Sequence, residues 1–188
     1  MKIGVVGTGY VGLVSGACFA EFGIDVTCID KDAAKIDMLK AGGIPIYEPG
    51  LDDLVAKQVK AGRLHFTTDL AEAVRDADAV FIAVGTPPSV VDGQADLTYV
   101  FQAAEEIAQH LNDYTIVVNK STVPVGTARR VEAVIRAANP NADFDVVSNP
   151  EFLREGAAID DFLRPDRVVV GTTSERARAV MRDLYRPL

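Results

Sequence analysis

The chain has 188 residues, of which 48% are hydrophobic and 24% charged, so it is long enough and apolar enough to bury a sizeable core. Its formal net charge of −8 argues against nucleic acid and against an anionic membrane surface as main partners. Its two cysteines are too few for a disulfide framework and no signal peptide is recognisable, so we expect a cytoplasmic protein.

In the first half of the chain, short runs rich in β-branched residues alternate with segments of helical periodicity. This pattern predicts strands over residues 2–7, 25–30, 63–68 and 78–85. It predicts helices over 10–22, 32–40, 51–61 and 69–77, the last with Asp69 as its N-cap. Residues 42–50 and 86–98 contain proline and glycine and are predicted to be loops. Residues 3–20 carry no charge, but their glycines keep the hydropathy below that expected of a membrane span.

The second half of the chain continues the alternation. Helices are predicted over 99–111, over 125–138 after Pro124, and over 174–185. Strands are predicted over 114–121, within 143–152, and over 167–173. Alternating strands and helices favour right-handed crossovers, so we expect the α/β class: a doubly wound parallel sheet of the Rossmann type in three α/β/α layers. Ligands of such sheets bind at the carboxyl ends of the strands.

The first strand is followed by a glycine pattern, G-x-G-x-x-G, formed by Gly7, Gly9 and Gly12. Such a pattern is informative only where it joins a strand to a helix, as it does here. Gly7 then allows a tight turn, Gly9 lets a pyrophosphate approach the backbone, and Gly12 lets the helix pack on the strand. The alternative is a tight structural turn that binds no dinucleotide.

An acidic residue is expected about 20 positions further on, at the end of the second strand. Asp30 stands there, 18 residues after Gly12. A carboxylate at this place accepts hydrogen bonds from ribose hydroxyls and repels a 2′-phosphate, so we predict NAD as the cofactor in preference to NADP. Lys31 and Lys35 weaken that repulsion.

Four loops at predicted strand ends carry an unusual set of residues: GIPIYEPGL (43–51), VGTPP (84–88), STVPVGT (121–127) and SNPEFLREG (148–156). In these loops, and over essentially its whole length, the chain resembles the nucleotide-sugar dehydrogenases, the UDP-glucose/GDP-mannose dehydrogenase family. Within that family it is most similar to the enzymes that oxidise UDP-glucose. The four loops together are far more specific than a glycine motif alone.

The resemblance implies a set of residues that bind NAD. The glycine turn would hold the pyrophosphate, and Asp30 and Lys35 the adenosine ribose. Thr86 would lie against the cofactor, and Thr122 near the nicotinamide and the reacting carbon. Whether Tyr10 stacks on the cofactor or only covers it is left open. The implied cofactor-binding residues are Gly7, Gly9, Tyr10, Val11, Gly12, Asp30, Lys35, Thr86, Thr122 and Glu155.

The resemblance also implies two catalytic residues, Thr122 and Glu151. Glu151 resembles the acid/base glutamate of the family, and Glu155 a residue that contacts both NAD and the sugar. The implied substrate-binding residues are Glu151, Phe152, Leu153, Arg154 and Glu155. If residues 150–156 formed a helical turn, both carboxylates would share one face. The alternative is that Glu151 favours a helix N-terminus and that Glu155 is a solvated surface charge.

The reaction implied by the resemblance is oxidation of UDP-glucose to UDP-glucuronate by two NAD, through a thioester on a cysteine. Cys18 and Cys28 fall on an apolar helix face and inside a strand, so we expect both to be buried and neither to be the nucleophile. We therefore expect residues 1–188 to be an NAD-binding N-terminal domain that is inactive alone. A central helix, a C-terminal UDP-sugar-binding domain and a homodimer interface would belong to the full-length enzyme.

Three alternatives remain open at this stage. In two of them the enzyme oxidises a sugar nucleotide other than UDP-glucose, either GDP-mannose or UDP-N-acetylmannosamine. In the third the chain is a stand-alone NAD-binding module that catalyses nothing. His65 and His110 are isolated, so no metal site is expected. Tyr47 and Glu48 order either a loop near the active site or an interface, and the sequence does not decide between these roles.

Overall fold

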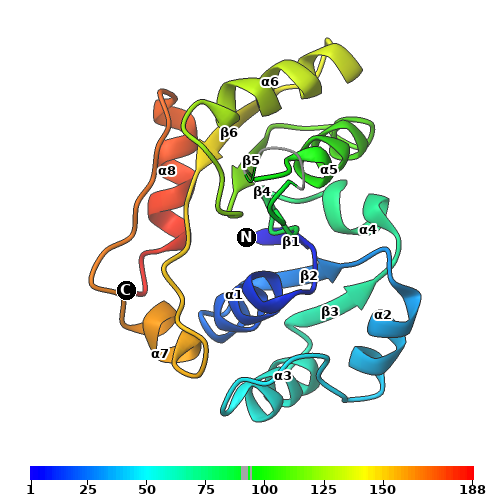
Figure 1. Ribbon diagram of the computed structural model, residues 1–188, viewed down its shortest axis with the longest axis vertical. Coiled ribbons are helices and arrows are strands. Elements are labelled where there is room, and N and C mark those ends of the chain that lie inside the picture. The colour runs from blue at the N-terminus through cyan, green and yellow to red at the C-terminus, as the bar shows by residue number, and fades with distance from the viewer. Residues whose placement is uncertain (90–92, 94) are drawn as a thin grey trace.

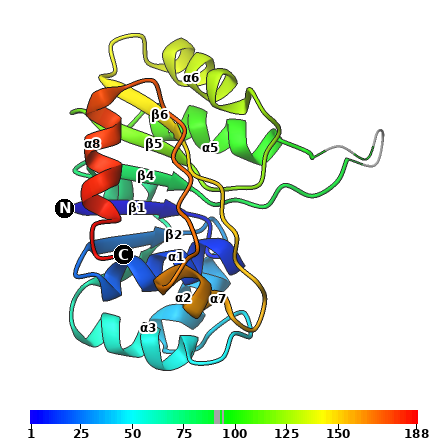
Figure 2. The ribbon, with the colours of Figure 1, turned by 90° about the vertical axis from the view of Figure 1, so that its left-hand side faces the viewer.

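A six-stranded, fully parallel sheet forms the centre of the computed structural model, which describes residues 1–89, 93 and 95–188. The strand order is β3-β2-β1-β4-β5-β6, and Figure 2 shows the strands stacked from β6 towards β2. This order confirms the predicted doubly wound sheet. The strands are β1 (Lys2–Val6), β2 (Asp25–Ile29), β3 (Leu64–Thr67), β4 (Ala79–Ile82), β5 (Thr115–Asn119) and β6 (Phe144–Ser148).

Helices cover both faces of the sheet, as Figure 1 shows. Alternate residues along a strand point to opposite faces, so Val5 and Phe81 join one apolar cluster while Val80 and Ile82 join the other. The first cluster includes residues of α1 (Tyr10–Glu21), α2 (Ala33–Lys40), α3 (Leu51–Lys60), α7 (Ala158–Leu163) and α8 (Glu175–Leu184). The second includes residues of α4 (Leu70–Val74), α5 (Thr98–Ala108) and α6 (Thr127–Ala138).

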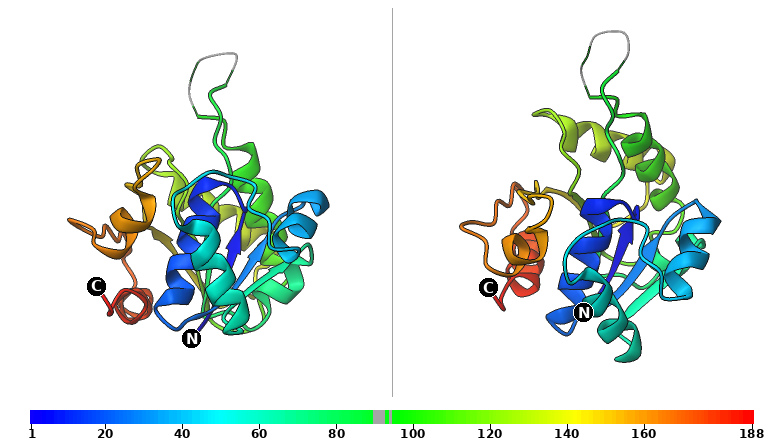
Figure 3. Two further views of the ribbon diagram at one scale, coloured as in Figure 1. Left: turned by 90° about the horizontal axis from the view of Figure 1, so that it is seen from below. Right: turned by 60° about the horizontal axis from the view of Figure 1, so that its bottom comes forward.

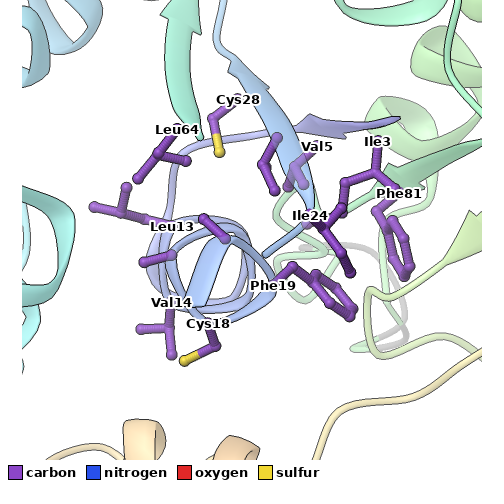
Figure 4. Packing of buried hydrophobic residues seen from close by; sticks show 14 of the residues in the cluster. Ile3, Val5, Leu13, Val14, Cys18, Phe19, Ile24, Cys28, Leu64 and Phe81 are labelled. Carbon is purple, nitrogen blue, oxygen red and sulfur yellow. The ribbon is translucent and has the colours of Figure 1, made fainter. Parts of the chain in front are cut away.

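Helix α1 is buried from Gly12 to Ala20, without an exposed stripe. Gly16 makes its close approach to β2 possible, because a Cβ there would lie 2.5 Å from the Cys28 sulfur. Phe19 of this helix contacts Phe81, with ring centroids 5.0 Å apart (Figure 4). It also contacts Phe162 and Tyr185, with ring centroids 4.9 and 5.4 Å away. These contacts bring α7 and the residue that follows α8 against α1, and Figure 3 shows the orange and red helices on the same side of the molecule. The helix that follows the glycine turn is therefore fixed from all sides.

Three local predictions were wrong. Residues 167–173 form no strand, and only a single antiparallel bridge joins Gly171 to Ser148. Helix α7 was not predicted. Helix α6 begins at Thr127, two residues later than expected, because Gly126 before it has a φ of 90°. Part of the loop predicted over 86–98, namely residues 90–92 and 94, lies outside the described residues. No helix in the described ranges has the length and hydropathy of a membrane span.

Candidate functional site

The glycine turn lies at the carboxyl end of β1, between β2 and β4. Gly7 has a φ of 104°, and its amide donates a hydrogen bond to the Ile29 carbonyl at 2.8 Å. A Cβ on Gly12 would lie 1.9 Å from the Gly7 carbonyl oxygen, so only glycine allows α1 to begin here. The predicted turning and packing roles of Gly7 and Gly12 are thus confirmed.

Gly9 differs from its two neighbouring glycines, because a Cβ on it would meet nothing within 4 Å and its φ is −73°. The packing of the domain therefore does not require glycine at this position. Gly9 is the N-cap of α1, and within the part of the chain that the structure describes no side chain caps the helix or places an acidic group in its first turn. The amides of that turn, which include those of Tyr10 and Val11, have no partner inside the helix. A helix end with free amides beside open space is suited to bind a phosphate.

Asp30 follows β2 and holds the glycine turn. Its Oδ2 accepts hydrogen bonds from the Thr8 amide at 2.9 Å and the Thr8 hydroxyl at 2.8 Å. Its Oδ1 accepts one from the Asp32 amide at 3.0 Å, and the Lys35 ammonium lies 3.7 Å from Oδ2. Burial alone would raise the pKa of Asp30, but these donors and Lys35 hold it below its usual value. Asp30 is therefore an ionised acceptor beside the turn.

A cavity of about 360 Å³ opens beside Asp30, between the ends of β2 and β4 and helix α5. Gly7, Asp30 and Lys35, which are three of the predicted cofactor-binding residues, line it. Sequence reasoning missed the opposite wall: Leu70, Tyr99, Gln102 and Glu106. Three of these recur at a spacing of three and four residues on α5, which is the available signal for one helix face. A 2.6 Å ion pair from Lys31 to Glu106 joins two residues that line the cavity.

Two predicted threonines meet at the ends of the next strands. Thr86 follows β4, and its hydroxyl donates a hydrogen bond to the Thr122 carbonyl, at 3.1 Å, in the loop after β5. Thr122 itself is exposed. The structure therefore brings these two loops together on the carboxyl side of the sheet, while neither threonine lines the cavity beside Asp30.

The segment after β6 carries the predicted substrate residues and is not helical over 150–156, so the two glutamates do not share a helix face. Glu151 is half-buried, and its Oε2 accepts a hydrogen bond from the Leu153 amide. Glu155 is exposed, directly before Gly156 with its φ of 87°. Arg154 pairs with Asp161 at 2.7 Å. The remaining two predicted substrate residues are apolar. Phe152 is exposed with the Arg167 guanidinium over its ring, whereas Leu153 packs on the core.

A buried lysine near Glu151 was not predicted. Lys120 follows β5, and its ammonium donates hydrogen bonds to the Asn149 side-chain oxygen at 3.1 Å and to the Tyr185 hydroxyl at 3.3 Å. Burial lowers the pKa of Lys120 to about 8, partly offset by the negative charge of Glu151. Lys120 and Glu151 line the same small pocket. The lysine is visible in the sequence, but its burial depends on residues far along the chain.

Glu48, whose role the sequence left open, is a buried carboxylate that accepts a hydrogen bond from the Tyr10 hydroxyl. It also accepts hydrogen bonds from the amides of Gly156 at 2.7 Å and Ala158 at 2.8 Å. Burial and the bond to Glu48 raise the pKa of Tyr10 to about 12. Tyr47, in contrast, is 87% exposed. Of the two open roles, the structure therefore gives Glu48 the ordering of a loop.

Both cysteines are buried, which confirms their predicted place in the core. Cys18 and Cys28 are both 0% exposed, and Figure 4 shows them among the buried hydrophobic residues around α1. Burial raises the pKa of each thiol to about 12. Neither thiol is exposed or ionised at neutral pH, as a nucleophile must be. Within the described residues, no group of three or more His, Cys, Asp and Glu side chains is arranged to hold a metal.

Comparison with known proteins agrees with this geometry. The model of the UDP-glucose/GDP-mannose dehydrogenase family, NAD binding domain, matches residues 1–188. A UDP-glucose 6-dehydrogenase of Rhizobium meliloti (strain 1021) is 64% identical over 190 aligned positions, which cover 100% of this chain and 44% of that protein. A UDP-glucose dehydrogenase structure from Pyrobaculum islandicum has a TM-score of 0.95 at 43% identity, covering 98% of this chain and 44% of the other.

A GDP-mannose dehydrogenase structure from Pseudomonas aeruginosa has a TM-score of 0.96 at 37% identity, covering 100% of this chain and 44% of the other. The chain thus spans less than half the length of these relatives. The fold, the glycine turn and the acidic residue after β2 agree with the family match over every residue of the chain. The chain belongs to the UDP-glucose/GDP-mannose dehydrogenase family, as its NAD-binding domain.

Proposed function

We propose that this chain binds NAD with the pyrophosphate against the first turn of α1. The observation that carries the proposal is the surroundings of Gly9, where the place of a Cβ is empty and the helix amides are uncapped. A diphosphate in this space would accept hydrogen bonds from those amides and would meet the positive end of the helix dipole. The residues of the turn therefore fit the cofactor.

The adenosine end of NAD would occupy the cavity beside Asp30. Each carboxylate oxygen offers about two acceptor sites. Among the described residues, Oδ1 of Asp30 has one partner, the Asp32 amide, so a ribose hydroxyl has a site to donate to. Lys35, 3.7 Å from the same carboxylate, lines this cavity as well. A 2′-phosphate would bring about two negative charges towards Asp30. We therefore expect NAD to bind more tightly than NADP.

The nicotinamide would lie near Thr86 and Thr122, at the ends of β4 and β5. NAD, when bound, supplies the hydride acceptor for an alcohol. The chain would supply the group that takes the hydroxyl proton, which we assign to Glu151. Its Oε2 accepts a hydrogen bond from the Leu153 amide. This bond fixes the carboxylate and leaves Oε1 to receive the proton. Thr122 would orient a water molecule, and the segment from Phe152 to Glu155 would contact the sugar.

We infer that the enzyme containing this domain oxidises UDP-glucose to UDP-glucuronate with two NAD. The relative at 64% identity is a UDP-glucose 6-dehydrogenase, whereas the GDP-mannose dehydrogenase structure shares 37% identity, and this difference favours UDP-glucose. A thioester step needs a reactive thiol, and Cys18 and Cys28 are buried with a pKa of about 12. We therefore expect this chain alone not to complete the reaction. A homodimeric enzyme in the cytoplasm, where such thiols stay reduced, is the setting that we propose.

Calorimetric titration of this chain with NAD, NADP and UDP-glucose tests the proposal. We expect micromolar to millimolar NAD binding, weaker NADP binding and little UDP-glucose binding. Heat for UDP-glucose but none for NAD, from a chain that is folded by circular dichroism, would overturn the proposed function. Loss of NAD binding when excess diphosphate is added would support the pyrophosphate site at α1.

A further inference from the structure

Glu48 is a charged side chain in an unusual place, since it is only 5% exposed. It lies in the loop between α2 and α3, two residues before Gly50, whose φ is 78°. Carboxylates are rarely so fully buried unless several donors surround them. Its donors are the Tyr10 hydroxyl and the amides of Gly156 and Ala158.

The donors of Glu48 come from segments that are far apart in the chain. Tyr10 is the first residue of α1 and is 38 positions away, while Gly156 and Ala158 are 108 and 110 positions away. One carboxylate thus joins the glycine turn to the turn that precedes α7. Every partner donates and Glu48 only accepts, so the three hydrogen bonds are satisfied together.

The bond to Gly156 has a direct effect on Glu155. The amide of Gly156 belongs to the peptide that joins it to Glu155, so Glu48 fixes the orientation of that peptide. On the other side of Glu155, the backbone amide of Arg154 donates a hydrogen bond to the Asp161 carboxylate at 2.8 Å, and the Arg154 guanidinium donates another at 2.7 Å. The exposed Glu155 is therefore anchored on both sides.

We propose that Glu48 is a positioning residue that sets the segment 151–157 at a fixed place relative to the first turn of α1. The proposal rests on the proposed function, in which that segment meets the sugar and that turn meets NAD. Glu48 touches neither substrate nor cofactor in this role, and it acts through Tyr10 and the two amides. The lowered pKa of Glu48, where these donors outweigh the effect of burial, keeps the acceptor ionised at neutral pH.

The test is Glu48→Gln, which keeps the shape of the side chain but replaces one acceptor oxygen by a donor. Glu21→Gln is the matched control. Glu21 also ties α1 to another segment by accepting hydrogen bonds, from Lys57 at 2.6 Å and from Gln58, but at the opposite end of the helix. Amide hydrogen exchange of Gly156 and Ala158 is measured by NMR on this chain, together with NAD affinity. The kcat and the KM for NAD are measured on the enzyme that contains the domain.

In Glu48→Gln we expect exchange at Gly156 or at Ala158 to accelerate at least about tenfold, because their two amides bond to different carboxylate oxygens and the amide nitrogen that replaces one of these cannot accept. We expect kcat to fall by about ten- to a hundredfold, because misplaced reacting groups cost rate, with the KM for NAD changed by less than about threefold. The Glu21→Gln control should leave these values at those of the parent. Both enzymes are assayed well below their melting temperatures, with the folded fraction measured by circular dichroism, because an unfolded fraction would also lower the apparent kcat at constant KM.

Two results separate failure of this inference from failure of the proposed function. A parent chain that binds NAD, with a Glu48→Gln variant whose amide exchange or kcat equals that of the parent, overturns the role of Glu48 alone. A folded parent chain that binds no NAD overturns the proposed function, and the positioning role falls with it.

Discussion

The carboxylate of Asp30 accepts hydrogen bonds from both the amide and the hydroxyl of Thr8, at 2.9 and 2.8 Å. Thr8 is fully buried between two glycines of the turn. The residue that we expect to select the cofactor is therefore also the one that holds the turn in shape. Its substitution will change binding and folding together, so the two effects must be separated.

For Asp30→Ala we expect NAD affinity to fall at least about tenfold, since hydrogen bonds to a charged group contribute about 1.5–3 kcal/mol. We also expect the preference for NAD over NADP to shrink, because the repulsive charge is removed as well. Calorimetry with both nucleotides measures the two effects. Thr8→Val is the control, because it disturbs the turn but keeps the charge, so the melting temperature should fall while the NAD to NADP ratio stays. An unchanged ratio in Asp30→Ala would contradict the assignment.

Gly9→Ala and Gly12→Ala should have opposite consequences. At Gly9 a Cβ meets nothing, so stability should change by no more than about 1 kcal/mol, while NAD affinity falls at least about tenfold because the methyl group occupies the phosphate space. At Gly12 a Cβ would lie 1.9 Å from the Gly7 carbonyl oxygen, so we expect a loss of at least about 2 kcal/mol of stability. Urea unfolding and NAD titration of both variants decide the matter. Normal NAD binding by Gly9→Ala would remove the pyrophosphate from this place.

Glu106→Gln should make NADP a better ligand. Glu106 holds the Lys31 ammonium at 2.6 Å, and the carboxylate is itself one of the acidic groups lining the cavity. Its neutralisation leaves Lys31 free to face a 2′-phosphate, so we expect NADP affinity to rise about three- to tenfold with NAD affinity little changed. The neighbouring Glu105→Gln is a matched control, because that exposed residue of α5 does not line the cavity. Equal NADP affinity in the two variants would speak against this effect.

Lys120→Met should stabilise the domain at pH 7 and lose that advantage as the pH rises. Burial lowers the pKa of Lys120 from its ordinary 10.5 to about 8. Between these values the unfolded chain holds a proton that the folded chain has released, so the stability of the parent gains from rising pH. Burying the charged ammonium of Lys120 therefore costs the parent folding free energy, and Lys120→Met removes this cost. The cost is full below pH 8 and small near pH 10, and it amounts to about 3 kcal/mol at most.

Unfolding in urea at several pH values, with parent and Lys120→Met compared at each, measures this dependence. The titrations of the buried cysteines and tyrosines are common to both proteins and cancel in the difference. Lys60→Met, at an exposed position of α3, should give a difference that does not vary with pH. A constant difference for Lys120→Met as well would contradict the lowered pKa.

The sheet and the glycine turn could be predicted because their signals are local. The alternation of β-branched runs and helical periodicity is written within each segment, and the roles of Gly7 and Gly12 follow from the backbone conformation that the turn requires. The run 167–173 misled the prediction because Val168 and Val169 favour strands, whereas strand formation also needs a neighbouring strand, and only Gly171 pairs with Ser148.

The parts that could not be predicted depend on distant contacts. Helix α7 has only six residues and no side-chain cap of its own, and its first amide is bound by Glu48, 110 positions earlier. The burial of Lys120 depends in the same way on Tyr185, 65 positions later. No window of sequence around α7 or Lys120 contains these partners. The cofactor turn was therefore found in advance, whereas the packing that supports the site was not.

Helix α1, buried from Gly12 to Ala20, gives the domain an unusual pattern of sensitivity to mutation. A typical surface helix accepts polar substitutions at every third or fourth position, so its tolerance to mutation oscillates with the helical repeat. In α1 we expect no such oscillation, because each of its middle positions faces packed protein. A library of variants should show one unbroken intolerant block there. Natural or engineered changes of cofactor preference would then arise in the loops around the cavity, while the helix that presents the turn stays constant.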